Sequence, residues 1–282
     1  MDLNRAIKFG QLVGAAYAIQ PNDLANKAGQ VVNAGLGTAA TSFEVIASFY
    51  ANDLATEINP LRATSLISIG LVLQSVAGDA VIAIRGTEGI LEWLHDGNFL
   101  MADCPFLSGA GHTEDGFTEM YNSMSIGTAA GSPALTKSLP TLPWKRPVTS
   151  LTICGHSLGG SLATLLALDI GANAPAPFKN PFVYTYASPR TGNTQFVNTY
   201  NHVVPNTFRI ANRLDLVPKL PLPPLYDHVL DLSDLNPVIL SFPLKFLVKP
   251  DIPCLHVLNS YLFLMSRLAG GPIIPLDPSS AP

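Results

Sequence analysis

The chain has 282 residues, 48% of them apolar and 13% charged, and its formal net charge is −4 at pH 7. It can therefore bury a sizeable core, whereas the acidic balance and the lack of any Lys/Arg run argue against a nucleic-acid partner. Three cysteines are too few for a disulfide framework and lack the spacing of a zinc site; at most Cys104 and Cys254 can pair, and free thiols are favoured. Because the composition does not shift along the chain, we predict a single domain over residues 1–282.

The N-terminal residues 1–19 predict an amphipathic helix that packs on the domain. Gln11 breaks an apolar stretch that would otherwise suggest a signal peptide, and the apolar residues recur at helical spacing. These residues are Ala6, Phe9, Val13, Ala16 and Tyr17. No segment reaches the ~18 continuous apolar residues of a membrane span. We therefore expect a soluble protein, with secretion left open.

The first strands of a sheet are predicted in the next part of the chain. Residues 43–50 are rich in aromatic and β-branched side chains and fit a strand or a short helix. Residues 68–74 and 80–84 are joined by a turn that contains glycine, which predicts a β-hairpin. The second strand of this hairpin ends at Arg85-Gly86-Thr87.

A strand, a tight turn and a helix are predicted in the middle of the chain, after a helix that begins near Asp115 or Gly116. The apolar residues 150–154 run directly into Gly155-His156-Ser157-Leu158-Gly159-Gly160, and residues 161–170 are strong helix formers. The remaining predicted elements are strands at 182–187, 207–211 and 226–232 and a helix at 193–200. This alternation predicts an α/β fold with a mostly parallel sheet and helices on both faces.

Gly155-His156-Ser157-Leu158-Gly159 matches a nucleophile elbow, a strained strand-to-helix turn that exposes a serine hydroxyl above the sheet. Glycines two residues before and after the serine relieve crowding in such a turn. The preceding strand and the following helix supply the expected context, so Ser157 is the candidate nucleophile. Cys154, inside the preceding strand, is interpreted as a small buried hydrophobe.

An oxyanion hole requires two hydrogen-bond donors that are directed at one point. The amide of Leu158, next after the nucleophile and at the start of a helix, is the first candidate. The second donor must come from elsewhere in the chain. Thr87 ends a predicted strand and can present its amide and hydroxyl to the same site.

Of the six histidines, only those that follow both the nucleophile and an acid fit the order Ser, acid, His that accompanies this elbow. His228 and His256 remain. His228 falls inside the predicted strand 226–232, whereas His256 follows a proline-rich loop and is expected to open a helix towards Leu262, a position more typical of catalytic residues. We therefore favour His256 as the base and interpret His228 as structural.

Asp215 is the favoured acid because it directly follows a predicted strand and precedes a proline that stops further regular structure. This position suits a carboxylate that reaches inward. The later aspartates are interpreted as solvated charges: Asp227, Asp231, Asp234 and Asp251.

These motifs resemble those of the class 3 lipases, the family of fungal triacylglycerol lipases and their bacterial and plant relatives. The resemblance runs from about Leu71 to Arg267 and rests on six blocks in family order. The blocks are Ala83-Ile84-Arg85-Gly86-Thr87, Gly116-Phe117 with Tyr121, Gly155-His156-Ser157-Leu158-Gly159-Gly160, Ala187-Ser188-Pro189-Arg190-Thr191-Gly192, Asp215-Leu216-Val217-Pro218, and His256 with Tyr261. The resemblance implies an α/β-hydrolase fold in which Ser157 is the nucleophile, Asp215 the acid and His256 the base. It also implies that Thr87 and Leu158 are the oxyanion donors.

Both lines of reasoning predict a serine carboxylic ester hydrolase, most simply a triacylglycerol lipase, that acts through an acyl-enzyme on Ser157. The expected substrate is an ester or lipid, with transient contact to a lipid interface, and no metal or organic cofactor is required. Alternatives with the same chemistry are a short-chain or feruloyl carboxylesterase and a phospholipase. The apolar stretch 235–248, just before His256, favours a lipid substrate. The alternative outside the enzymes is a catalytically inactive lipid-binding module with the same fold. The oligomeric state is open.

Residues 88–99 predict a short lid over Ser157. The stretch has the two-faced pattern of a surface helix, with apolar residues Ile90, Leu91, Trp93 and Leu94 and polar residues Glu92, His95 and Asp96. By the resemblance, Trp93 stands where the family places a lid tryptophan, and Asp96 would accept a hydrogen bond from the Thr87 hydroxyl when the lid opens. A fixed surface helix with one buried tryptophan is the alternative.

Overall fold

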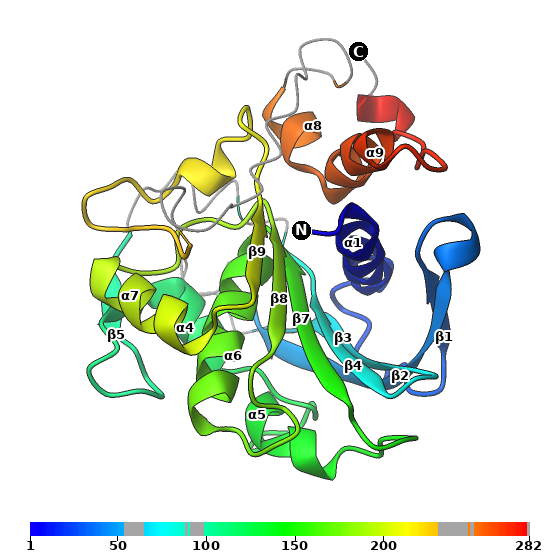
Figure 1. Ribbon diagram of the computed structural model, residues 1–282. Helices are drawn as coiled ribbons and strands as arrows, with labels where there is room; N and C mark the ends of the chain where they lie inside the picture. The colour runs from blue at the N-terminus through cyan, green and yellow to red at the C-terminus, as the bar shows by residue number, and fades with distance from the viewer. Residues whose placement is uncertain (54–64, 88–89, 91–98, 231–247, 249–250, 281–282) are drawn as a thin grey trace.

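A central seven-stranded sheet organises the protein in the computed structural model (Figure 1), which describes residues 1–53, 65–87, 90, 99–230, 248 and 251–280. In spatial order the strands are β1 (Val31–Ala34), β2 (Thr41–Asn52), β3 (Leu66–Ser75), β4 (Asp79–Ile84), β7 (Ser150–His156), β8 (Phe182–Tyr186) and β9 (Thr207–Ile210). The neighbours from β1 to β4 are antiparallel. The neighbours from β4 to β9 are parallel, so their carboxyl ends meet at one edge of the sheet.

Helices cover both faces of this sheet (Figure 1), which confirms the predicted α/β-hydrolase fold class. One face is covered by α1 (Leu3–Tyr17) and α9 (Leu258–Ala269), and the other by α4 (Asp115–Asn122), α6 (Leu158–Asn173) and α7 (Thr194–Val203). The short elements are β5 (Met101–Asp103), β6 (His112–Glu114), α5 (Leu135–Ser138), α8 (Ile252–His256) and the 3-10 turns η1 (Gly37–Ala39), η2 (Leu139–Thr141), η3 (Val217–Lys219) and η4 (Pro278–Ser280). None of the described helices has the length and apolarity to cross a bilayer.

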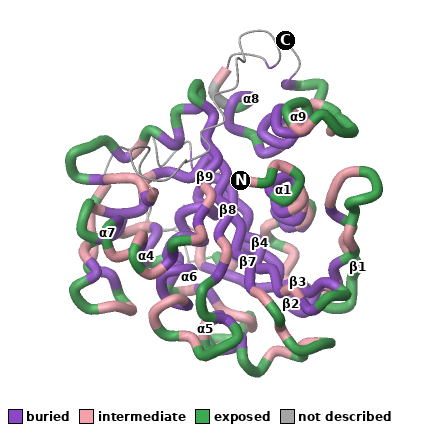
Figure 2. Tube along the Cα trace, viewed as in Figure 1, coloured by how far each residue is buried: buried purple, intermediate pink, exposed green. Residues whose placement is uncertain are grey.

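The core consists of two apolar layers, one on each side of the sheet. Strand side chains pack with α4 and α6 on one side and with α1 and α9 on the other. Figure 2 shows this as burial concentrated in the strands and in the helix faces turned towards them. Helix α6 is buried along almost its whole length, because α4, α5 and α7 cover the side that does not face the sheet. An apolar helix without a polar face is expected at such a position.

The N-terminal helix α1 forms as predicted and packs one apolar face on the sheet. Asp2 caps it, and its carboxylate accepts a hydrogen bond from the Asn4 N–H at 2.9 Å. Gly10 lies where α1 crosses α9, and a Cβ at this position would come within 2.6 Å of Leu262 Cδ2. The absence of a side chain at Gly10 therefore allows the close approach of the two helices.

The strand predicted over residues 226–232 is wrong for the described residues 226–230. Asp227 makes a single bridge to Gly192, and Leu230 has a φ of 52°, outside the extended region. Alternating hydrophobicity does not by itself supply a partner strand, and this segment is held by side-chain contacts instead. One of them joins the Tyr226 hydroxyl to the Leu100 carbonyl at 2.8 Å.

The position of His256 also differs from the expectation, because it ends the short helix α8 rather than opening a longer helix. The Asp251 side chain caps α8 by accepting the Cys254 N–H at 2.9 Å, so the helix begins at Ile252, four residues before His256. The backbone then becomes extended at Val257, with a ψ of 140°, and α9 starts afresh at Leu258.

Two alternatives left open by the sequence are decided by the structure. The stretch 43–50 lies in strand β2, where it pairs with β3, and is not a helix. All three cysteines are buried and no disulfide joins Cys104 to Cys254. Cys154 lies within β7, and burial raises the pKa of its thiol, which disfavours the reactive thiolate.

Candidate active site

The nucleophile elbow lies at the carboxyl end of β7, where the strand passes into α6 through Ser157. Ser157 has φ 59° and ψ −130°, a strained conformation for a residue with a side chain. A Cβ at Gly155 would come within 2.0 Å of the Gly159 carbonyl oxygen, and one at Gly159 within 2.5 Å of the Ile84 carbonyl oxygen. The two glycines of the motif are therefore required by close backbone packing around the turn.

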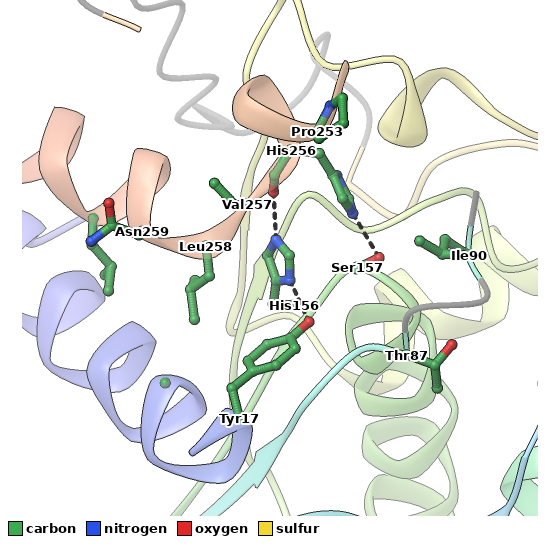
Figure 3. Close-up of a pocket in the computed structure, with 12 residues that line it drawn as sticks. Tyr17, Thr87, Ile90, His156, Ser157, Pro253, His256, Val257, Leu258 and Asn259 are labelled. Atoms are coloured by element: carbon green, nitrogen blue, oxygen red, sulfur yellow. Dashed lines mark hydrogen bonds between the residues drawn. The ribbon is translucent and has the colours of Figure 1, made fainter. Parts of the chain in front are cut away.

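Ser157, His256 and Asp215 form a continuous chain of hydrogen bonds (Figure 3 shows the first link). Ser157 Oγ lies 2.8 Å from His256 Nε2, and His256 Nδ1 lies 2.8 Å from Asp215 Oδ2. All three residues are buried. The structure thus brings together the three residues that the sequence nominated, although 99 residues separate the serine from the histidine.

The Asp215 carboxylate is held by two further donors. The Tyr261 hydroxyl donates to Oδ2 at 2.8 Å, and the Val217 N–H donates to Oδ1 at 3.0 Å. The Tyr261 hydroxyl in turn accepts the Asn212 N–H at 2.9 Å. Burial raises the pKa of Tyr261 well above its usual range, and the charge of Asp215 raises it further, so the phenol stays a donor.

A second network behind the elbow joins His156 to the helix α1. The Tyr17 hydroxyl lies 2.8 Å from His156 Nδ1 and accepts the Gly86 N–H at 2.8 Å; because the other ring nitrogen, Nε2, faces a carbonyl oxygen, Nδ1 is the acceptor and the hydroxyl donates to it. His156 Nε2 then carries the proton and donates to the His256 carbonyl oxygen at 2.8 Å (Figure 3). Burial holds the pKa of His156 well below 6.5, and the neighbouring His256 lowers it further. His156 is therefore a neutral residue that fixes the backbone of His256.

Sequence reasoning placed Tyr17 only on the apolar face of the N-terminal helix, and it excluded His156 from the base assignment without finding its structural role. The two residues are 139 positions apart, so only the packed fold could reveal their contact. Tyr261 appeared in the family resemblance, but its bond to Asp215 did not. A polar tip on the buried face of α1 was the one local signal for Tyr17.

Thr87 lies immediately beyond β4, next to the elbow. Its Oγ1 atom is buried and has no hydrogen-bond partner among the described residues. Gly86 allows this approach, since a Cβ there would lie 2.9 Å from Ser157 Cβ. Leu158 is the first residue of α6, and the first amides of a helix have no acceptor within the helix. Thr87 lines the same pocket as Ser157, and Leu158 follows the serine directly in the chain, so both remain candidate donors.

A pocket of about 610 Å³ opens beside these groups (Figure 3). Its lining is Gly14, Tyr17, Thr87, Ile90, His156, Ser157, Pro253, His256, Val257, Leu258, Asn259 and Leu262. Ile90 is buried and is the member of the predicted lid that the structure places at the pocket. The other predicted lid residues lie outside the described residues: Leu91, Trp93, Leu94 and Asp96. Most of the apolar stretch 235–248 also lies outside them.

Metal binding finds no support in the described residues, where no group of three His, Cys, Asp or Glu side chains is placed to hold an ion. The arrangement around Ser157 consists of a hydroxyl, an imidazole and a carboxylate in series. This set of groups can perform nucleophilic acyl transfer with the side chains of the chain itself.

Comparison with known proteins finds relatives that are named as lipases and phospholipases. The sequence is 31% identical over 144 residues to a secreted mono- and diacylglycerol lipase 1 of Fusarium solani, which covers 51% of this chain and 39% of that one. It is 32% identical over 184 residues to a phospholipase A1-II 3 of Oryza sativa subsp. indica, with 58% and 44% covered. The chain thus spans less than half of the length of these relatives.

A similar fold occurs in the crystal structure of the Lip2 lipase of Yarrowia lipolytica. The TM-score is 0.55 at 20% sequence identity, with 80% of this chain and 75% of that chain covered. The model of the family described as lipase (class 3) matches residues 81–224, just over half of the chain. This range contains Ser157 and Asp215, and the fold adds His256 from beyond it. The chain belongs to the class 3 lipase family.

Proposed function

We propose that the protein is a serine carboxylic ester hydrolase that cleaves lipid esters through an acyl-enzyme on Ser157. The observation that carries this proposal is the unbroken chain from Ser157 Oγ through His256 to Asp215, with 2.8 Å at each link. Hydrogen bonds of this length allow the proton of the hydroxyl to pass to the imidazole as the oxygen attacks.

In the proposed mechanism His256 Nε2 accepts the Ser157 proton while Oγ attacks the ester carbonyl. Asp215 holds Nδ1–H and stabilises the imidazolium that forms. The imidazolium then donates its proton to the leaving alkoxide, which leaves the acyl group on the serine. Water attacks this ester with His256 again as base, and the carboxylic acid is released.

The negative charge on the attacked carbonyl oxygen needs two donors. We assign them to the Leu158 amide, at the positive end of α6, and to Thr87. The buried Thr87 hydroxyl supports this assignment: it has no partner among the described residues, and a buried donor without a partner is costly unless a ligand uses it. These donors are in place before the charge appears, so little reorganisation is needed during the reaction.

An acylglycerol is the substrate class that we propose. The described lining of the pocket is mainly apolar and contains no lysine or arginine that would bind a phosphate. This favours a neutral glyceride over a phospholipid, although one relative is named a phospholipase. The name of the other, a mono- and diacylglycerol lipase, agrees with the neutral substrate.

The test is hydrolysis of p-nitrophenyl esters of increasing acyl length, followed by tributyrin, a long-chain triacylglycerol and phosphatidylcholine, with Ser157→Ala as the blank. We expect activity that exceeds the blank on the esters and the glycerides. Activity on phosphatidylcholine alone would reassign the substrate class. A wild-type protein no more active than Ser157→Ala on every ester would refute the proposal and favour a binding module.

A further inference from the structure

The pocket extends beyond the reacting groups into a slot between α1 and α9. Gly14 of α1 lines the slot from one side, and Leu258, Asn259 and Leu262 line it from the other. In Figure 3 Leu258 and Asn259 lie on one side of the His156 ring, and Thr87 and Ile90 lie on the other, near Ser157. One continuous pocket therefore has a part over the serine and a second part between two helices.

The polar groups of the slot are already engaged within the protein. The Asn259 amide donates to the Pro275 carbonyl oxygen at 3.1 Å, and its carbonyl accepts the Asp277 N–H at 2.7 Å. Tyr17 and His156 use their polar atoms in the network behind the elbow. The described residues of the slot thus offer a ligand hydrocarbon contacts and no polar side chain that needs a partner, which suits an alkyl chain.

The two glycines on this face of α1 have different surroundings. A Cβ at Gly10 would collide with Leu262 Cδ2 at 2.6 Å, so this glycine serves helix packing. A Cβ at Gly14, one turn later, would have no heavy atom of the described residues within 4 Å. Glycine inside a helix is unfavourable relative to alanine, and packing does not require it at position 14. Its effect is to leave the slot open one turn beyond the close approach of Gly10 and Leu262.

We propose that the slot between α1 and α9 binds the acyl chain of the substrate and that Gly14 sets the length of chain it accepts. This rests on the ester hydrolase function proposed above. The slot is continuous with the pocket that contains Ser157, so an acyl group on the serine can extend into it. The contact of Gly10 with Leu262 marks the narrow end.

The experiment measures kcat/KM for p-nitrophenyl butyrate, octanoate, decanoate and palmitate with the wild type, Gly14→Leu and Ala18→Leu. Ala18 is the exposed C-cap of α1, so its variant adds the same side chain outside the pocket. We expect Gly14→Leu to lower the palmitate-to-butyrate ratio of kcat/KM by about tenfold or more, the scale on which a filled apolar pocket discriminates between chains. Ala18→Leu should keep the wild-type ratio.

Each outcome bears on one proposal. Equal ratios in Gly14→Leu and the wild type, with both enzymes folded and active on butyrate, would overturn the role of the slot. Equal loss on all four esters would also overturn it, because a chain-length filter must spare short chains. If Gly14→Leu fails to fold, Gly14→Val tests the same space with a smaller side chain. Inactivity of the wild type on every ester would instead contradict the hydrolase function itself.

Discussion

Two histidines that follow the nucleophile in the sequence occupy regions with opposite chemistry. His256 lies between a serine hydroxyl and a carboxylate, each 2.8 Å from one of its ring nitrogens. His228 places its Nε2 2.6 Å from the Pro218 carbonyl oxygen. Burial lowers the pKa of His228 well below 6.5, and the positive charges of Arg209 and Arg190 lower it further.

The difference shows what makes a histidine a base. A ring that must receive a proton needs a group that delivers it and a carboxylate that stabilises the resulting cation, and His256 has both. The environment of His228 opposes a positive charge, and its bond to a backbone carbonyl fixes the segment after the proline-rich loop. The same side chain is therefore reactive in one region and structural in the other.

The largest effect is expected from removing a side chain of the triad, whereas removing the ring of His228 should have little effect on activity. Ser157→Ala and His256→Ala should each lower kcat on p-nitrophenyl butyrate by at least ~10⁴-fold. The serine and the histidine act as one catalytic unit, so the loss of either one disables the unit. His228→Ala should retain most of the activity of the folded protein. Circular dichroism and urea unfolding control for structure in all three variants. An inactive His228→Ala beside an active His256→Ala would reverse the comparison.

The next effect concerns the donor beside the serine. Thr87→Val keeps the shape of the side chain and removes the hydroxyl, and it should lower kcat by about 10²-fold to 10³-fold, the loss typical of one oxyanion donor. KM should change little, because the bond strengthens as charge develops. Thr87→Ser supplies the matched control and should recover most of the rate. A Thr87→Val enzyme with unchanged kcat would remove this hydroxyl from the oxyanion hole.

A smaller effect is expected from the tyrosines that support each region. Tyr17→Phe leaves both the Gly86 N–H and His156 Nδ1 without a partner, which should lower the free energy of unfolding by about 1–3 kcal/mol. Tyr226→Phe removes a single bond to the Leu100 carbonyl and should cost about 1 kcal/mol. Urea titration of both variants measures the difference. A larger loss in Tyr226→Phe would contradict the supporting role of Tyr17.

The remaining effect is an acid sensitivity that arises from the neutral histidines His156 and His228. The pKa of His156 is held well below 6.5 in the folded protein, whereas in the unfolded chain it returns towards that value. As the pH falls below 6.5 the unfolded chain binds the proton first, so the free energy of unfolding decreases by up to about 1.4 kcal/mol per pH unit. The contribution of neutral His156 to the free energy of unfolding is therefore fully present above pH 6.5 and is lost as the pH falls.

Urea unfolding at pH 7.5, 6.5 and 5.5 measures this slope, and His228 should add to it in the same direction. The variant His156→Gln should show a shallower loss between pH 6.5 and 5.5 than the wild type. Identical slopes would mean that His156 accepts a proton in the folded protein as readily as in the unfolded one.

The elements with local signals were predictable from sequence. The glycines around Ser157 predict the tight turn, because a side chain at either position would collide with the backbone. The spacing of the apolar residues in α1 predicts which face of the helix is buried. The strand predicted around His228 failed because pairing depends on a neighbouring strand that the local pattern does not contain. His256 was nominated through chain order and loop position, while its actual place at the end of α8 depends on the cap at Asp251.

Contacts between distant parts of the chain could not be predicted. The bonds from Tyr17 to His156 and from Tyr261 to Asp215 join segments that meet only when α1 and α9 pack on the sheet. The different surroundings of Gly10 and Gly14 are likewise invisible in a helical pattern, since both fall on one face at a spacing of four residues. Such features need the packed structure.

The most direct test of the central claim is covalent trapping of the nucleophile with an alkyl p-nitrophenyl phosphonate, an analogue of the tetrahedral intermediate. We predict that the wild type and His228→Ala each release one nitrophenolate per protein, and that peptide mass spectrometry locates the phosphonyl group on Ser157. His256→Ala should react slower by orders of magnitude. A phosphonyl group on another residue, or equal labelling rates in His256→Ala and the wild type, would contradict the assignment of Ser157 and His256 as nucleophile and base.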